Sequence, residues 1–366
     1  MLQMTQHQTM RAAFIVCAIL ALGAAPSAHA ADPYFKGKRI TMIVNFAAGG
    51  PTDIEGRLFA KYLARHIEGQ PNVIVQNMEG AGGVVGAQYL GEIAPKDGSM
   101  LGYLSGMSWI YVNEPERWRV DLRSYEFLAY QPGDTVQFVR TDVPPGMKQP
   151  TDIAKARGLI AGGLSADTSK DLRTRLGLDL LGVPFQYVTG YRSGAPARLA
   201  MQRGEINMFS ESTPGYLSLV VPTFIDTGLA IPVWYDAVDL NDAPAPPELA
   251  GRPIMSFPKL YQTIKSAPPS GRLWDAYRTI FEINATMQRL IVLPPGAAPA
   301  AVAALRAAVE QIDHDPEFAA EAGRSINFAP HYVAGPDTNA EVRRMLVASP
   351  EIRAFVADYI KNPPKR

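Results

Sequence analysis

Residues 40–90 read ITMIVNFAAGGPTDIEGRLFAKYLARHIEGQPNVIVQNMEGAGGVVGAQYL, and this stretch decides the fold. It contains two short runs rich in β-branched residues, 39–45 and 72–76, and each run leads into a glycine-rich turn. Apolar residues at helical spacing follow the first turn: Ile54, Leu58, Tyr62 and Leu63. Strand, glycine turn and helix in this order predict parallel strands that are covered by helices.

The same alternation continues toward the C-terminus, with a further strand predicted at 100–104. The turn at 143–146 follows a strand and marks the crossover into a second lobe, and the proline-rich stretch 242–253 has the composition of a linker. We therefore expect an α/β protein of two lobes. The first lobe begins with residues 31–138, the second comprises 139–250, and 251–366 return to the first.

Residues 1–30 have the pattern of a removable export signal. Arg11 supplies a positive charge, an apolar stretch follows at 12–25, and Ala28-His29-Ala30 fits a cleavage site. We expect cleavage after Ala30 and location in the periplasm. The only cysteine, Cys17, lies inside this segment, so the exported chain would depend on its core rather than on disulfides.

The charge balance argues against nucleic acid as a partner. Lysine plus arginine and aspartate plus glutamate number 35 each, whereas nucleic-acid-binding proteins concentrate basic charge. No segment after residue 30 is apolar for long enough to span a bilayer.

The two glycine turns, 46–53 and 80–86, are predicted at the carboxyl ends of neighbouring strands, where ligands of open α/β sheets bind. Each turn leads into a helix, and helix N-termini present free N–H groups and a positive dipole end. Two such ends side by side predict a site for a small anion. The alternative is that both are ordinary tight turns. Asp53 has two interpretations as well, a helix cap or a carboxylate that orients the turn around a ligand.

Patterns for catalysis or cofactor binding are absent from the sequence. Gly80-Ala81-Gly82 resembles the start of a dinucleotide motif, but Val85 stands where the third glycine belongs. No histidine lies at metal-ligand spacing from another, and no serine lies in a G-x-S-x-G turn. We therefore expect no catalytic residue, no metal and no cofactor.

The second lobe has similar turns, 162–168 and 188–194, each between a predicted strand and a helix. Arg192 could hold a carboxylate through two parallel hydrogen bonds, or it could simply be solvated. Ser210 ends a further strand, where ordinary helix capping is the alternative role.

Three segments together resemble the substrate-binding receptors of tripartite tricarboxylate transporters, also called Bug-type receptors. Residues 40–90 are similar to the family pattern of a strand, P-[FY]-x-A-G-G-x-x-D, a helix, a second strand and G-A-G-G-x-x-G. The runs YVTGYRSGAPARLAMQRGEI (187–206) and LPPGAAPAAVAALRAAVEQIDHDPEFAAEAG (293–323) resemble the family's second-lobe and returning segments.

The resemblance implies a type II periplasmic-binding-protein fold, with two α/β lobes that are joined by crossing strands and enclose a ligand cleft. Carried over to this sequence, the first-lobe site comprises Ala48, Gly49, Thr52, Asp53, Gly82 and Gly83, and we add Ser105 at the end of the third strand. The second lobe would supply Ser165, Thr168, Tyr191, Arg192 and Ser210.

The sequence departs from the family in places that bear on the ligand. Asn45 stands where the family usually has proline. Ser165 and Asp167 replace glycines, and Asp171 stands where many members have histidine. The second lobe, which sets ligand specificity in this family, is thus the lobe that matches the family pattern least well.

We expect a monomeric, non-enzymatic receptor that captures a di-, tri- or aromatic carboxylate by lobe closure. The resemblance implies delivery of this solute to a two-component membrane permease. Two alternatives remain: a ligand-dependent sensor for a membrane kinase, and an exported two-lobe α/β enzyme.

Overall fold

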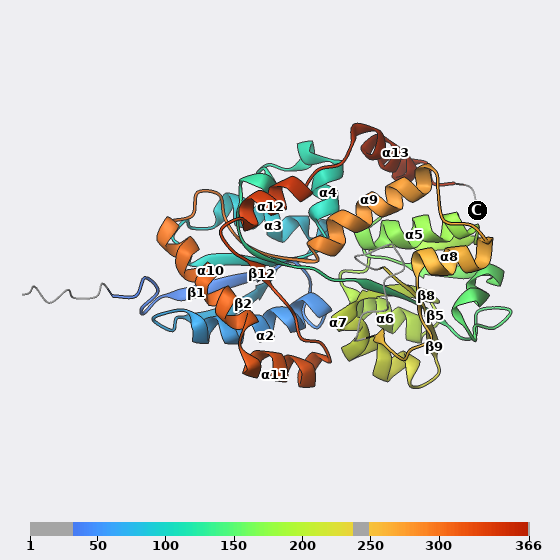
Figure 1. Cartoon of the computed structure of the whole chain (residues 1–366), viewed down its shortest axis with the longest axis horizontal. Coiled ribbons are helices and arrows are strands. Elements are labelled where there is room, and N and C mark those ends of the chain that lie inside the picture. The colour runs from blue at the N-terminus through green and yellow to red at the C-terminus, as the bar shows by residue number, and fades with distance from the viewer. Residues whose placement is uncertain (1–31, 237–248, 365–366) are drawn as a thin grey trace, which may run out of the picture. The chain divides into compact units, whose positions relative to one another are not determined.

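The computed structural model describes residues 32–236 and 249–364, and residues from Tyr34 onward form one compact unit. The predicted export signal and its cleavage site after Ala30 lie outside the described residues, as does part of the predicted linker. Figure 1 shows two sheets, each with helices packed around it. Each sheet has six strands, which confirms the predicted α/β class with two lobes.

The first sheet has the order β12-β4-β11-β3-β1-β2. Its strands are β1 (Arg39–Val44), β2 (Asn72–Asn77), β3 (Met100–Leu104), β4 (Glu126–Gln131), β11 (Arg289–Leu293) and β12 (Val333–Ala334). β1 pairs in parallel with β2 and β3, as the alternating pattern predicts. β11 pairs antiparallel with both β3 and β4, so the returning part of the chain fills the middle of this sheet.

The second sheet has the order β10-β9-β5-β8-β6-β7. Its strands are β5 (Thr135–Arg140), β6 (Leu159–Gly162), β7 (Phe185–Val188), β8 (Met208–Ser212), β9 (Ala230–Tyr235) and β10 (Met255–Ser256). The chain passes from the first sheet to the second between Gln131 and Thr135, a few residues before the predicted boundary at 138. Strand β10 extends the second sheet beyond residue 250. Whether the two sheets move as separate lobes stays a prediction.

Helices follow the strands at their carboxyl ends. The longer ones are α2 (Pro51–His66), α3 (Val84–Ile93), α5 (Ser169–Leu181), α6 (Gly194–Gln202), α8 (Phe257–Lys265), α9 (Arg272–Thr286), α10 (Pro299–Asp313), α11 (Pro316–Ile326), α12 (Thr338–Met345) and α13 (Pro350–Lys361). Shorter ones are α4 (Ser108–Asn113), α7 (Thr213–Gly215), η1 (Ala81–Gly83), η2 (Pro115–Arg117), η3 (Leu122–Ser124) and η4 (Pro150–Lys155). The π-helical η5 (Tyr216–Ile225) has 10 residues. None of the described helices has the length and apolar character that a membrane span requires.

Helix α2 begins inside the first glycine turn, because Pro51 occupies the first helical position. Proline suits that position, since its fixed φ matches a helix and its missing N–H would be unpaired there anyway. The glycine turn therefore delivers the chain directly into the helix.

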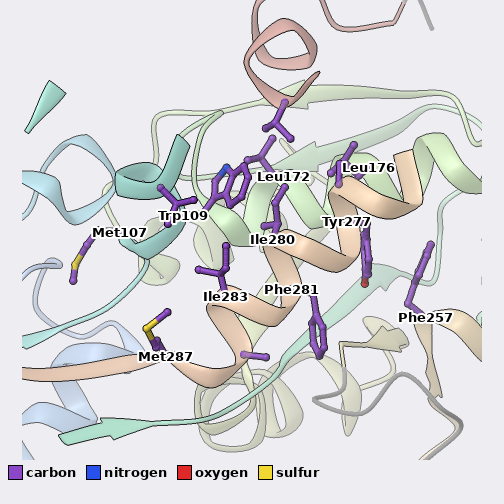
Figure 2. Close-up of a cluster of buried hydrophobic side chains, with 14 of the residues drawn as sticks. Met107, Trp109, Leu172, Leu176, Phe257, Tyr277, Ile280, Phe281, Ile283 and Met287 are labelled. Carbon is purple, nitrogen blue, oxygen red and sulfur yellow. The ribbon is translucent and has the colours of Figure 1, made fainter. Parts of the chain in front are cut away.

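Helix α9 connects the helices of the two sheets. It contacts α5, α4 and α13, and Figure 1 shows it lying along α5. Tyr277, Ile280 and Phe281 recur at helical spacing on its buried face. Figure 2 shows Ile280 beside Trp109 of α4 and Leu172 of α5. All five are buried in one hydrophobic cluster, so α9 joins the core of one sheet to that of the other.

We predict that Leu172→Ala lowers the free energy of unfolding by about 2–5 kcal/mol, because it leaves a cavity in this fully buried cluster. Leu199→Ala is the matched control, since Leu199 is 45% exposed and its loss should change stability by less than about 0.5 kcal/mol. Urea unfolding followed by circular dichroism measures both. Equal effects of the two substitutions would contradict the assignment of this core.

Candidate functional site

Asn45, directly after β1, joins the turns at the carboxyl ends of the first sheet. Its fully buried amide donates hydrogen bonds to the carbonyl oxygens of Ser105 (2.8 Å) and Gly83 (3.1 Å), and its side-chain oxygen accepts from the Ser105 N–H (3.0 Å). Gly83 has a φ of +97°, and a side chain there would overlap that of Asn45. The residue that departs from the family's proline therefore fixes the second glycine turn against the end of β3.

Asp53 holds the first glycine turn in a similar way. Its buried carboxylate accepts hydrogen bonds from the Gly49 N–H (2.9 Å), the Asn77 amide (2.8 Å) and the Arg57 guanidinium (3.1 Å). Burial alone would raise the pKa of Asp53, but these three partners outweigh it and lower the pKa. Asp53 does not line the pocket described next, so this geometry favours its role in orienting the turn.

A pocket lies between the turns of the first sheet and those of the second. The residues that line it are Phe46, Gly50, Pro51, Thr52, Ser105, Gly106, Thr135, Leu164, Thr168, Lys170, Ser193, Gly194, Glu211, Ser212, Asn284, Gln288 and Arg289. Three of the residues predicted from the sequence are among them, namely Thr52, Ser105 and Thr168. The hydroxyl oxygens of Thr52 and Ser105 lie 3.0 Å apart.

The other predicted residues do not line the pocket. They are Ala48, Gly49, Asp53, Gly82, Gly83, Ser165, Tyr191, Arg192 and Ser210. A Cβ on Gly82 would come within 2.9 Å of the Thr168 side chain, so the second glycine turn lies against the second sheet's turn. The side chain of Arg192 is 79% exposed, and it faces Glu79 at 3.8 Å. A role for these residues in binding stays a prediction.

Lys170 is a cation that lines the pocket and was not predicted from the sequence. It follows the Thr168 cap by two residues, and its side chain is only 16% exposed. Its ammonium donates to the carbonyl oxygen of Ser210 (2.8 Å) and lies 3.9 Å from the centre of the Phe209 ring. Asp171 is 3.8 Å away. Burial lowers the pKa of Lys170, and the charges of Asp171 and Glu211 oppose that shift.

A second cation, Arg289, reaches the pocket from β11. Its guanidinium forms a buried ion pair with Glu55 of α2, and it lies 3.4 Å from the Ser212 hydroxyl. Burial raises the pKa of Glu55, with Arg289 acting against the shift. Because Glu55 already neutralises the charge of Arg289, Arg289 would attract an anion in the pocket less strongly than Lys170 would.

Glu211, at the end of β8, is the acidic residue among the lining side chains. Its carboxylate pairs with Arg198 of α6, and both side chains are nearly buried. The pocket wall of the second sheet thus contains a carboxylate of its own.

Several buried polar atoms of the lining residues have no hydrogen-bond partner among the described residues: Ser193 Oγ, Gln288 Oε1 and Arg289 Nε. Buried polar groups are nearly always paired, and an unpaired one costs about 1–3 kcal/mol.

The turns of the two sheets touch around the pocket. Ser193 Cβ lies 3.4 Å from the position of a Cβ on Gly50, and Pro51 lies against Gly215. Two ion pairs bridge the sheets at the surface, Arg192 with Glu79 (3.8 Å) and Arg117 with Asp167 (3.5 Å). In this structure, the turns of both sheets therefore border the pocket and contact each other around it.

The described histidines lie outside the pocket, each close to an aspartate. His66 Nε2 lies 2.8 Å from the Asp315 carboxylate, and His331 Nδ1 lies 2.9 Å from that of Asp313. No group of three or more potential metal ligands occurs within residues 32–236 and 249–364.

Two curated proteins match part of the sequence, whereas no protein-family model matches it. A UPF0065 protein from Cupriavidus necator is 35% identical over 128 residues, which are 32% of this chain and 38% of that protein. A UPF0065 protein from Agrobacterium vitis is 29% identical over 194 residues, or 51% of this chain and 54% of that protein. The matches thus span about half or less of the length of these relatives.

Solved periplasmic binding proteins share the fold over most of the chain. BugD superposes with a TM-score of 0.65 at 18% identity, covering 88% of this chain and 98% of BugD. MatC from Rhodopseudomonas palustris, solved with malate, gives 0.63 at 17% identity over 89% and 100% of the two chains. Another R. palustris protein, solved with adipate, gives 0.61 at 17% identity over 89% and 96%.

The solved structures identify the fold as that of periplasmic binding proteins. UPF0065 denotes the Bug family. The partial sequence matches and the shared fold therefore confirm the predicted resemblance to Bug-type periplasmic binding proteins.

Proposed function

We propose that the protein is a periplasmic receptor that binds a small carboxylate in the pocket between its two sheets. The observation that carries the proposal is the position of Lys170, a nearly buried ammonium that lines the same pocket as the start of α2. Two of the ammonium's neighbours, the Ser210 carbonyl and the Phe209 ring, carry no formal charge. A ligand carboxylate would supply a closer anion than Asp171 does.

The start of α2 supports the same ligand class. Gly50, Pro51 and Thr52 line the pocket at the N-terminus of a 16-residue helix. The first N–H groups of a helix have no partner inside it, and its dipole favours negative charge at this end. A carboxylate between this helix start and Lys170 would be bound from both sheets.

Two structural neighbours were solved with malate and adipate, which are dicarboxylates. Their ligands support a carboxylate as the class of solute for this pocket. Phe46, Pro51 and Leu164 add apolar surface that would cover the carbon skeleton.

We further propose that the ligand stabilises the arrangement in which the two sheets' turns touch. A ligand held from both sheets binds this arrangement better than an open one, and this difference in affinity shifts the equilibrium toward it. In this form the protein, acting as a monomer, would deliver its solute to a two-component membrane permease.

The ligand class can be tested by a thermal-shift screen of the purified protein. A carboxylate that binds the folded state at 100 times its Kd should stabilise the protein by about 2.7 kcal/mol and raise Tm with concentration. Mono- and dicarboxylates are the test set, with sugars, uncharged amides and phosphate as controls. A response to sugars or phosphate, with none to carboxylates, would contradict the proposed ligand class.

Lys170→Gln should weaken carboxylate binding at least tenfold, because it removes the cation while keeping a hydrogen-bond donor of similar size. Lys155→Gln is the control, since Lys155 is exposed and lies outside the pocket. Isothermal titration calorimetry measures both, with Tm as a check on folding. Unchanged affinity in Lys170→Gln would remove the central group of the proposed site.

Asn45→Ala should lower stability by about 2 kcal/mol, because it leaves the Ser105 N–H and two carbonyl groups without their buried partner. It should also weaken carboxylate binding, since the turns that face the ligand lose their common support. Asn72→Ala is the control, because Asn72 is exposed at the opposite end of β2. Wild-type affinity in a folded Asn45→Ala protein would show that this contact does not position the site.

A further inference from the structure

Glu211 occupies a position in the pocket that would otherwise suit an anion. Its carboxylate lies directly against Gly194, the first residue of α6, where the helix dipole favours negative charge. Arg198, one turn further along α6, pairs with it. Lys170 feels the charge of Glu211 as well.

Ser193 is a buried polar residue in this part of the pocket. It precedes α6, lines the pocket and is 2% exposed, and its hydroxyl has no hydrogen-bond partner among the described residues. The start of α6, Ser193 and Arg198 together could bind a polar group. The carboxylate of Glu211 already neutralises the positive charge of Arg198 and of the helix start.

We propose that Glu211 takes the place of a second ligand carboxylate. The solute would then be a monocarboxylate whose other polar group is a hydrogen-bond donor, either a hydroxyl or an ammonium. This inference rests on the proposed function and specifies its ligand class.

Lys170, the start of α2 and Glu211 all line the pocket. Lys170 and the start of α2 attract the single carboxylate. Glu211, which lies against Gly194, offers acceptor oxygens to a donor and repels a second carboxylate. Like charges at contact distance in a buried site interact strongly, since water screens them little. A solute whose second polar group is a donor therefore finds a partner in Glu211, whereas a solute with a second carboxylate is repelled.

The inference is tested with acids of matched chain length that differ only at the far end: butanoate, 4-hydroxybutanoate, 4-aminobutanoate and butanedioate, together with the six-carbon series. Calorimetry on the wild-type protein should show that a hydroxy or amino acid binds at least tenfold more tightly than the dicarboxylate of the same length. Equal or tighter binding of the dicarboxylate would overturn the inference and leave the proposed carboxylate receptor intact. Failure of every acid to bind would overturn both.

Glu211→Gln removes the charge and keeps the shape. The variant should gain at least tenfold in the ratio of dicarboxylate to hydroxy-acid affinity, because the second carboxylate now replaces the missing charge beside Arg198. Glu205→Gln is the control, since Glu205 is 55% exposed, lies on the same lobe and pairs with Arg203. An unchanged ratio in Glu211→Gln would overturn the inference.

Removal of Glu211 leaves Arg198 buried without its partner, which can impair folding. In that case, the ratio of hydroxy-acid to dicarboxylate affinity in the wild-type protein tests the inference without a variant. Tm of Glu211→Gln adds a second readout: a dicarboxylate should raise it more than a hydroxy acid at equal concentration, whereas the order in the wild-type protein should be the reverse. The same order in both proteins would count against the role of Glu211.

Discussion

The buried amide of Asn45 is the contact on which the first-sheet side of the pocket depends. It ties the end of β1 to the glycine turn after β2 and to the end of β3, through three hydrogen bonds of 2.8–3.1 Å. Backbone turns rich in glycine are costly to order, and this single side chain holds one of them against the end of β3. Asp53 does the same for the turn that leads into α2, through Gly49 and Asn77. The turns that border the pocket are thus supported by two side chains, Asn45 and Asp53, that do not line it.

In the second sheet, charged side chains hold the turns that border the pocket. Asp171 accepts hydrogen bonds from the backbone N–H groups of Leu164 and Ser165, and it thereby shapes the turn between β6 and α5. Glu211 is neutralised by Arg198, and Arg289 by Glu55. Buried ion pairs of this kind add little net stability, because desolvation offsets their attraction. Their effect is to fix which charges face the pocket, and this leaves Lys170 as the cation with the most distant anionic partner of the three.

The sequence is sufficient for the fold and for part of the site. Strand, turn and helix alternate with a clear periodicity, so β1, β2 and the glycine turns are predictable from the order of the residues alone. Thr52 and Thr168 are predictable as well, because they lie at helix starts after expected strands, where a fold of this class binds ligands.

The remaining site residues depend on tertiary contacts that no local pattern records. Arg289 reaches Glu55 across 234 positions of sequence, because the returning strand β11 pairs antiparallel with β3 in the middle of a mixed sheet. Turn residues also have no fixed periodicity, so the direction of each side chain is not predictable. The chemistry of Arg192 favours carboxylate binding, yet its side chain is exposed, and the neighbouring Ser193 lines the pocket instead.

The proposed function requires that a carboxylate binds between Lys170 and the start of α2. A crystal structure of the protein with its tightest-binding carboxylate tests this claim most directly. We expect one carboxylate oxygen within hydrogen-bond distance of the Lys170 ammonium and the other facing the backbone N–H groups of the first glycine turn. A ligand bound elsewhere, or bound in this pocket with its carboxylate turned away from Lys170, would contradict the account.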